Sequence, residues 1–355
     1  MISTRKSVYL LLILGTFTSC TKEYVTYENE YVTNQYVTNK SENIYNKEYY
    51  STILSQQQEI TEDIRAPYLK AGDTVAICAT SNYVNESEMA VGKAVLQEWG
   101  LNVVEADNLY KQDGRYAGTV GERIEGLQKM IDNPNVKAIF TARGGYGCAQ
   151  IMDLMDLKPM INNPKWVIGY SDVSVLLIAL NNMGIESVHG PMVKSLTDEL
   201  SNEQLRKTLF GEVDAISITT NNNCVKGTAE GRLVGGNLSM IYSLGGTLFD
   251  LNAKGAILFI EDTGDDNYAV DRMLTNLKLS GKLDYIKGIV IGQFINMTQG
   301  SDKTLEEIIS EKVAGLNIPV MYGLQSGHDT RNLALYLGRN IKLEVGEEAS
   351  TITFK

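Results

Sequence analysis

The chain has 355 residues, of which 43% are hydrophobic and 21% are charged, and its formal net charge at pH 7 is -11. A chain of this length and composition can bury a sizeable core and is long enough for two domains, which excludes a disordered protein. The acidic balance argues against nucleic acid as a partner, because such binding depends on Lys and Arg side chains that neutralise phosphates.

The first twenty residues have the pattern of a targeting segment. A short basic region is followed by an apolar run that is too short to span a membrane and that ends in Thr18-Ser19-Cys20. A cysteine directly after small residues resembles a bacterial lipobox, with 1–19 as the signal peptide and Cys20 as the lipidated residue. We therefore expect a periplasm-facing lipoprotein of the cell envelope, held at the inner or outer membrane only by this anchor. The alternative is an ordinary signal peptide with an incidental cysteine.

Residues 20–63 are polar and rich in tyrosine, and the triplet Tyr-Val-Thr recurs at Tyr24, Tyr31 and Tyr36. Such a composition buries little apolar surface and predicts a tether that separates the rest of the chain from the membrane. A short coiled coil is the alternative, since Tyr24, Tyr31 and Tyr45 share a seven-residue phase.

The remaining cysteines give no sign of a disulfide framework or a zinc site. If Cys20 carries lipid, then Cys78, Cys148 and Cys224 are left, an odd number in an oxidising compartment. The sequence also lacks a Cys-x-x-Cys pair and any cluster of Cys and His. We expect neither disulfides nor a structural metal.

From residue 68 onward, short apolar runs alternate with amphipathic stretches. Strict alternation of strand and helix predicts a parallel sheet with helices on both faces, so residues 64–200 are expected to form a Rossmann-like α/β domain. The pattern predicts strands at 74–79, 101–106 and 136–142 and helices at 88–100 and 121–132.

Two further strand-to-helix units carry candidate site residues. The strand at 136–142 leads into the glycine-rich loop 143–147 and an expected helix at 148–156. The strand at 166–170 leads into Ser171-Asp172 and an apolar helix. Ligands collect at the carboxyl ends of strands in open parallel sheets, where both loops would lie.

The sequence pattern of the second half of the chain is less regular. We expect an interdomain linker at 201–230, followed by a smaller mixed α+β domain at 231–355. This domain contains apolar runs at 256–262 and 288–294 and an alternating tail.

Ser171 is the best candidate nucleophile. A serine at a sharp strand-to-helix turn is exposed beside the amide donors of a helix N-terminus, and Gly169-Tyr170-Ser171 gives half of the nucleophile-elbow pattern. A serine followed by aspartate at a helix start is also typical of a plain N-cap, so the local sequence leaves both interpretations open.

The chain contains only two histidines, which narrows any histidine-dependent mechanism. His328 lies in a polar, turn-like stretch, where a loop can hold it toward a cleft or leave it as a surface residue. His189 stands beside a Gly-Pro pair at an expected strand end, where it either bonds the backbone or lines a pocket near Ser171. Glu261 ends an apolar strand. Its carboxylate is either half-buried there, where it can orient a histidine, or simply exposed.

Six segments, in matching order from about residue 68 to the C-terminus, together resemble the serine L,D-carboxypeptidases, also called muramoyltetrapeptide carboxypeptidases. They are 72–81, 142–156, 164–174, 235–247, 258–274 and 326–332. The resemblance implies a catalytic triad of Ser171, Glu261 and His328 at the interface of two domains. It also implies a reaction that needs no metal or cofactor.

The resemblance suggests a substrate and two alternatives. The expected partner is a muropeptide or peptidoglycan stem peptide, from which the enzyme releases terminal D-alanine. His328 would act as the base and Glu261 as its orienting group, with the backbone amides of Asp172 and Gly145 as the oxyanion hole. The alternatives are a microcin-immunity peptidase that cuts a peptide-nucleotide amide and a lipoprotein that binds wall peptides without cutting them. Whether the protein forms a homodimer is left open.

Overall fold

The structure is a computed structural model that describes residues 60–61 and 63–355. The expected signal peptide, Cys20 and nearly all of the expected tether lie outside these residues. Within the described part of the chain, no helix combines the length and the apolar character needed to cross a membrane.

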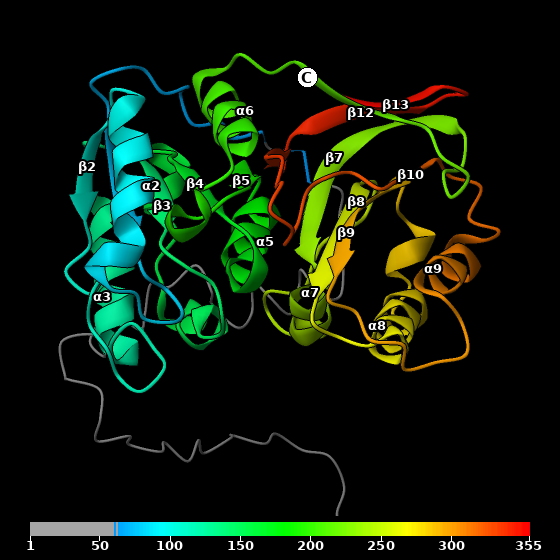
Figure 1. The fold of residues 1–355 in the computed structure, drawn as a ribbon, viewed down its shortest axis with the longest axis horizontal. Coiled ribbons are helices and arrows are strands. Elements are labelled where there is room, and N and C mark those ends of the chain that lie inside the picture. Colours follow the sequence, from blue (N-terminus) through cyan, green and yellow to red (C-terminus); the bar gives the residue numbers. More distant parts are fainter. Residues whose placement is uncertain (1–59, 62) are drawn as a thin grey trace, which may run out of the picture. The chain divides into compact units, whose positions relative to one another are not determined.

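One sheet is built mainly from the first half of the described chain. Its strands are β1 Thr74–Cys78, β2 Asn102–Glu105, β3 Val136–Thr141, β4 Trp166–Gly169, β5 Ser187–His189 and β11 Leu335–Leu337. They lie in the order β11-β5-β4-β3-β1-β2, with β1 to β5 parallel and β11 antiparallel to β5. Figure 1 shows β2, β3, β4 and β5 of this sheet. The strand order reverses between β1 and β3, which is where such sheets bind ligands.

Helices cover both faces of this sheet, as the alternating sequence pattern predicts. They are α2 Glu86–Glu98, α3 Val120–Asp132, α5 Ser174–Asn182 and α6 Glu199–Phe210, with the short α4 Pro159–Asn162. Val75 and Ile77 of β1 share a core with α2 and α6, whereas Ala76 and Cys78 share the opposite core with α3 and α5. This split follows because successive side chains of a strand point to opposite faces.

Local sequence sets the starts of two of these helices. Capping boxes of Asn85 with Glu88 and of Thr119 with Glu122 begin α2 and α3. In each box the two side chains satisfy backbone N–H groups that a helix start leaves unpaired.

The expected helix at 148–156 is wrong. This segment forms two 3-10 turns instead, η1 Cys148–Gln150 and η2 Met152–Leu154. The Arg123 guanidinium binds the Gly147 carbonyl at 2.7 Å, and the Asp172 carboxylate accepts the Cys148 N–H at 2.8 Å. These two anchors hold the start of the segment in a tight turn, although Ile151, Met152 and Met155 have helical spacing and are buried.

The second sheet is mixed, with parallel strands on one side and antiparallel strands on the other. Its strands are β6 Ala215–Thr219, β7 Gly227–Asn237, β8 Ile257–Thr263, β9 Gly288–Ile295, β10 Val320–Tyr322, β12 Asn340–Val345 and β13 Ala349–Phe354. They lie in the order β10-β9-β8-β7-β12-β13-β6. The associated helices are α7 Leu238–Leu244, α8 Asn267–Leu279 and α9 Leu305–Val313. The expected α/β fold with a mixed second part is therefore confirmed.

The chain passes between the sheets three times, and the sequence did not indicate the last two crossings, into and out of β11. Residues 201–230, where we expected a linker, contain most of α6 and all of β6. α6 packs into a core of the first sheet, whereas β6 is an edge strand of the second. After β10 the chain returns to the first sheet as β11 before β12 rejoins the second.

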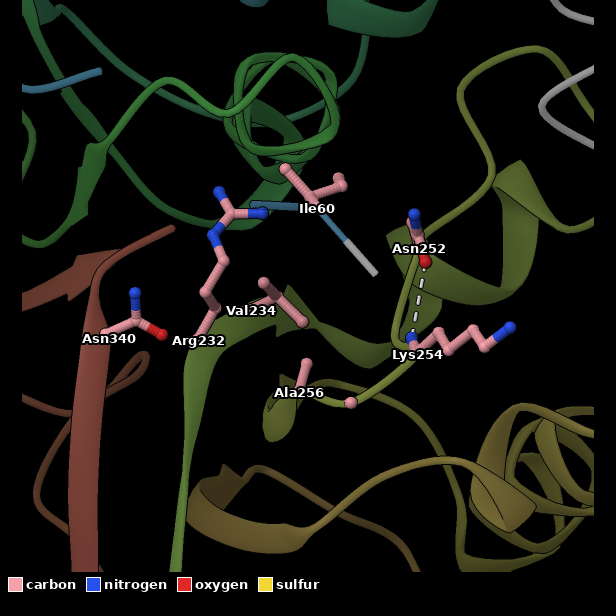
Figure 2. A pocket seen from close by; sticks show the side chains of 8 residues that line it. Ile60, Arg232, Val234, Asn252, Lys254, Ala256 and Asn340 are labelled. Carbon is pink, nitrogen blue, oxygen red and sulfur yellow. Dashed lines mark hydrogen bonds between the residues drawn. The ribbon is translucent and has the colours of Figure 1, made fainter. Parts of the chain in front are cut away.

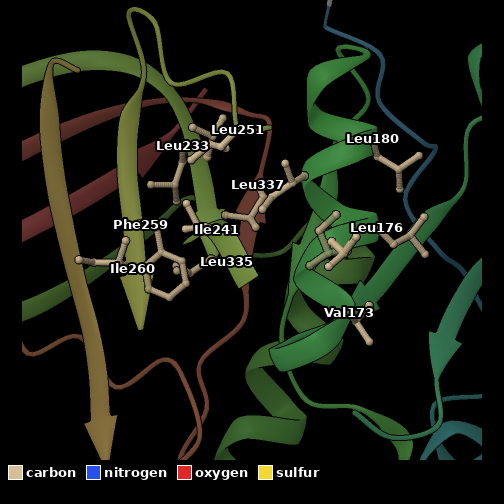
Figure 3. Packing of buried hydrophobic residues seen from close by; sticks show 14 of the residues in the cluster. Val173, Leu176, Leu180, Leu233, Ile241, Leu251, Phe259, Ile260, Leu335 and Leu337 are labelled. Atoms are coloured by element: carbon tan, nitrogen blue, oxygen red, sulfur yellow. The ribbon is translucent and has the colours of Figure 1, made fainter. Parts of the chain in front are cut away.

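A single apolar cluster joins the two sheets. It contains Leu176 and Leu180 of α5 together with Leu233 of β7, Phe259 of β8 and Leu337 of β11 (Figure 3). α5 also packs directly on β7 and α7. The loop before α5 and the ends of β7 and β8 are therefore fixed relative to one another.

Candidate active site

Ser171 occupies a strained turn between β4 and α5. It begins the 3-10 turn η3 (Ser171–Val173), and its φ is +60°, a left-handed value that few residues other than glycine adopt. The N-cap residue of η3 is Tyr170 and that of α5 is Val173, so Ser171 occupies neither N-cap position and the plain N-cap interpretation is wrong. A strained serine between a parallel strand and a helix is instead typical of a nucleophile elbow.

The glycine-rich loop after β3 passes beside Ser171. A Cβ built at Gly144 would lie 3.2 Å from Cβ and 3.3 Å from Oγ of Ser171. Gly145 has a φ of +119°, and a Cβ there would lie 2.3 Å from the side-chain nitrogen of Asn82. Gly145 therefore requires glycine, whereas an added Cβ at Gly144 would press on Ser171, and the backbone of this loop lies close to the serine hydroxyl. An oxyanion role for the Gly145 and Asp172 amides remains a prediction.

The Asp172 side chain, which the sequence analysis did not use, ties three loops together. Its buried Oδ2 accepts hydrogen bonds from Ser81 Oγ at 2.5 Å and from the Cys148 N–H at 2.8 Å. These partners follow β1 and the glycine-rich loop, so one carboxylate anchors the elbow to both. Arg123 is a second buried charged residue that the sequence analysis did not use. Its Nη1 donates to the carbonyls of Thr80 and Gly147, and its place among the apolar positions of a predicted helix was a usable signal.

Glu261 is fully buried near the end of β8. The pairing of β8 with β9 shifts register between Ile260 and Asp262, so Glu261 lies at an irregularity of the kind that re-aims a side chain. Its Oε2 lies 2.6 Å from Nδ1 of His328. Burial alone raises the pKa of Glu261, but the interactions with His189 and His328 outweigh it and lower the pKa to about 2. Glu261 is therefore a carboxylate at neutral pH.

His328 is held by the loop that runs from β10 to β11. Gly327 has a φ of +148°, and a Cβ there would lie 3.1 Å from Oε2 of Glu261, so glycine lets the loop approach the carboxylate. Gln293 of β9 braces the same loop by accepting the Asp329 N–H at 3.1 Å and donating to the Arg331 carbonyl at 2.9 Å. The sequence analysis missed Gln293, although a polar residue in an otherwise apolar strand was a usable signal.

The ends of the two sheets bring the three predicted catalytic residues into one region. The His328 ring packs edge-on against Tyr170, the neighbour of Ser171, with centroids 4.9 Å apart. His328 Nδ1 is bound to Glu261, and its buried Nε2 has no hydrogen-bond partner among the described residues. The arrangement leaves a histidine nitrogen available as a base beside the elbow, which suits activation of a hydroxyl nucleophile.

The structure also contains a small cavity (Figure 2). Its volume is about 30 Å³, enough for a water molecule or two but not for a peptide. Figure 2 shows Arg232, Asn252 and Asn340 among its lining side chains, and none of the predicted catalytic residues belongs to the lining. The cavity is therefore not the site of the predicted chemistry.

Comparison with known proteins identifies two family models in this chain. The model of the LD-carboxypeptidase N-terminal domain matches residues 75–190, and that of the C-terminal domain matches residues 230–343. The first match includes Ser171, and the second includes Glu261 and His328.

Relatives match nearly the whole described chain. A probable murein peptide carboxypeptidase of Bacillus subtilis is 32% identical over 80% of this chain and 92% of its own. A crystal structure of muramoyltetrapeptide carboxypeptidase from Oxalobacter formigenes superposes with a TM-score of 0.72, is 27% identical and covers 79% of this chain and 98% of its own.

A third relative has a different described role. The microcin C7 self-immunity protein MccF of Escherichia coli is 26% identical over 80% of this chain and 94% of its own. Its structure in complex with aspartyl sulfamoyl adenosine superposes with a TM-score of 0.74 and covers 82% of this chain and 98% of its own. Taken with the two domain matches, these similarities show that the chain belongs to the LD-carboxypeptidase family.

Proposed function

We propose that the protein is a serine-type L,D-carboxypeptidase that releases terminal D-alanine from the tetrapeptide stems of peptidoglycan. The observation that carries the proposal is the 2.6 Å bond between buried Glu261 and His328, next to a serine in a strained elbow. Family membership supports the carboxypeptidase chemistry. The murein peptide names of the Bacillus and Oxalobacter relatives support the substrate class.

The proposed mechanism has two half-reactions. His328 Nε2 takes the proton from Ser171 Oγ, which attacks the carbonyl carbon of the scissile amide, and Glu261 stabilises the resulting imidazolium. The backbone amides of Gly145 and Asp172 stabilise the oxyanion. His328 then gives the proton to the departing nitrogen as the C–N bond breaks. Water, deprotonated by His328, attacks the acyl-enzyme and restores Ser171.

The direct test follows free D-alanine by mass spectrometry after incubation with a disaccharide tetrapeptide. We expect release by the parent chain and none by Ser171→Ala. Ser217→Ala is a matched control, because Ser217 is an exposed serine on β6, four strands away from β8 in the same sheet. Release by the control at the parent rate would attribute the loss to the Ser171 hydroxyl. Equal release by Ser171→Ala would contradict the serine mechanism.

The same assay separates the two alternatives. A peptide-nucleotide amide is the substrate class suggested by the similarity to MccF, whose structure holds an aspartyl sulfamoyl adenosine. Cleavage of such an amide without D-alanine release would favour the immunity-type activity. Binding of the tetrapeptide without any product would favour a non-catalytic binding lipoprotein.

The proposal includes a lipid anchor at Cys20 and a periplasm-facing location. It is supported by the basic region, the apolar run and the Thr18-Ser19-Cys20 pattern. We expect the parent to fractionate with membranes and Cys20→Ser to lose lipid labelling. Full lipid labelling of Cys20→Ser would contradict the anchor.

A further inference from the structure

His189 is a second histidine at the junction of the two predicted halves of the site. It ends β5 of the first sheet, and its Cα is paired with Leu335 of β11, the strand that follows the His328 loop. Its ring packs edge-on against Phe259 of β8, with centroids 4.9 Å apart, and lies 6.0 Å from the Tyr170 ring. The side chain is fully buried. His189 therefore contacts β8, which carries Glu261. It also contacts the neighbour of Ser171 and the strand that follows the His328 loop.

One ring nitrogen of His189 faces the same carboxylate that binds His328. Its Nε2 lies 3.7 Å from Oε1 of Glu261, and both side chains are fully buried. Neither of these two atoms has a hydrogen-bond partner among the described residues. A buried carboxylate oxygen without a donor is costly, and so is a buried ring N–H without an acceptor.

The other ring nitrogen of His189 suggests which tautomer is present. Nδ1 lies 3.3 Å from Oγ of Ser326, two residues before His328. If the Ser326 hydroxyl donates to Nδ1, the ring proton must be on Nε2, where it points toward Glu261. The 3.7 Å separation is longer than a hydrogen bond, but a movement of about 0.7 Å closes it. Catalytic hydrogen bonds commonly tighten in this way when substrate binds.

We propose that His189 is a positioning residue that donates its Nε2–H to Oε1 of Glu261 and so fixes the carboxylate that orients His328. Glu261 would then be held from both sides, with Oε2 on His328 and Oε1 on His189. This inference rests on the proposed serine mechanism and adds to it a fourth residue that does not touch the substrate. Without His189, the carboxylate would rotate more freely and His328 would be less well oriented.

The first test reads the tautomers directly. Because the chain has only two histidines, selective ¹⁵N-histidine labelling of the full chain, purified without a histidine tag, gives signals from His189 and His328 alone. In the neutral rings we expect the proton of His189 on Nε2 and that of His328 on Nδ1. A proton on Nδ1 of His189 would overturn the proposal, because Nε2 would then present a lone pair to the carboxylate.

The second test separates donation from packing. His189→Phe keeps an aromatic ring against Phe259 and Tyr170 but removes both nitrogens, whereas His189→Gln keeps an amide N–H near the position of Nε2. We expect His189→Phe to lower kcat about 10- to 100-fold with little change in KM, and His189→Gln to recover most of the rate. Parental kcat in a folded His189→Phe variant would overturn the proposal.

The NMR measurement also keeps this proposal separate from the proposed function. If the parent releases no D-alanine, the serine carboxypeptidase assignment fails, but the His328 Nδ1–H signal still reports on Glu261. We expect that signal to shift or broaden in His189→Phe and to remain unchanged in His189→Gln. An unchanged signal in both variants would show that His189 does not hold the carboxylate.

Discussion

The backbone of Ser171, the predicted nucleophile, has a strained conformation. A φ of +60° forces the Cβ of an L-residue close to its own backbone, which costs roughly 1–2 kcal/mol relative to glycine. The hydrogen bonds of Asp172 to Ser81 and Cys148 hold the turn in this conformation. The surrounding contacts therefore maintain a geometry that the local chain would not choose.

This strain predicts a difference between two inactive variants. Ser171→Ala and Ser171→Gly both lack the hydroxyl, but only alanine keeps a Cβ at positive φ. We expect the glycine variant to have a free energy of unfolding about 1 kcal/mol higher than the alanine variant. Urea unfolding of both measures the difference. An alanine variant at least as stable as the glycine variant would be inconsistent with a strained elbow.

Glu261 couples the proposed site to pH. Its pKa in the folded chain is about 2, below the ordinary value of 4.5, so its ionised form stabilises the fold above about pH 4.5. That contribution is lost as the pH falls from 4.5 toward 2, and its size is on the order of 3 kcal/mol.

We expect Glu261→Gln to show a flatter acid dependence of stability than the parent. The difference in unfolding free energy between parent and variant should shrink as the pH falls from 5 to 2, because protonation makes the two side chains nearly equivalent. Chemical unfolding over this pH range measures the difference. A difference that does not change with pH would mean that Glu261 titrates normally in the folded protein.

At the scale of elements, the glycine-rich loop and the elbow are packed against each other. A methyl group at Gly144 would meet Ser171 Cβ at 3.2 Å and Met192 Cε at 3.3 Å. Met192 can move because its side chain is flexible, but the Ser171 turn is anchored by Asp172. The added methyl group should therefore displace the nucleophile rather than unfold the loop.

We expect Gly144→Ala to fold and to lower kcat about 10- to 100-fold by shifting Ser171 Oγ. Gly121→Ala is the matched control, because Gly121 lies in α3 with no atom within 4 Å of an added Cβ. The control should keep the parental kcat and gain up to about 1 kcal/mol of stability. Parental activity in Gly144→Ala would show that the loop does not constrain the serine.

At the scale of the whole described chain, the shared core predicts cooperative unfolding. Leu176 of α5 is buried in the apolar cluster that also contains Leu233 and Phe259 of the second sheet. β11 adds a covalent link, since the chain leaves the second sheet and returns to the first. The two sheets should therefore lose their structure together.

The two tryptophans make this testable. Trp99 and Trp166 both lie in the first-sheet part of the chain, so their fluorescence reports on that part, whereas far-UV circular dichroism reports on both sheets. We expect coincident unfolding midpoints, and Leu176→Ala should lower the unfolding free energy by about 2–5 kcal/mol in both signals. A shift in fluorescence alone would mean that the sheets unfold independently.

The sequence by itself determined the elements whose signals are local. Apolar runs of strand length and amphipathic or apolar helical stretches correctly predicted β1 to β4 and helices α2, α3 and α5, because burial patterns act within one element. The same local signals singled out Ser171, Glu261 and His328, since each is a reactive residue type at a strand end or in a polar loop. Their roles remain predictions for the assays above.

Only the tertiary structure decided what depends on distant contacts. Helical spacing at 148–156 predicted an α-helix, but the segment forms two 3-10 turns because Arg123 and Asp172, from elsewhere in the chain, hold its start. No periodic sequence pattern indicates that β11 returns to the first sheet. Nor does one indicate that Glu261 pairs with His328, 67 residues away in sequence. His189 had two open interpretations until its distance to Glu261 was known. Packing between remote segments is set by the whole fold, and no local pattern encodes it.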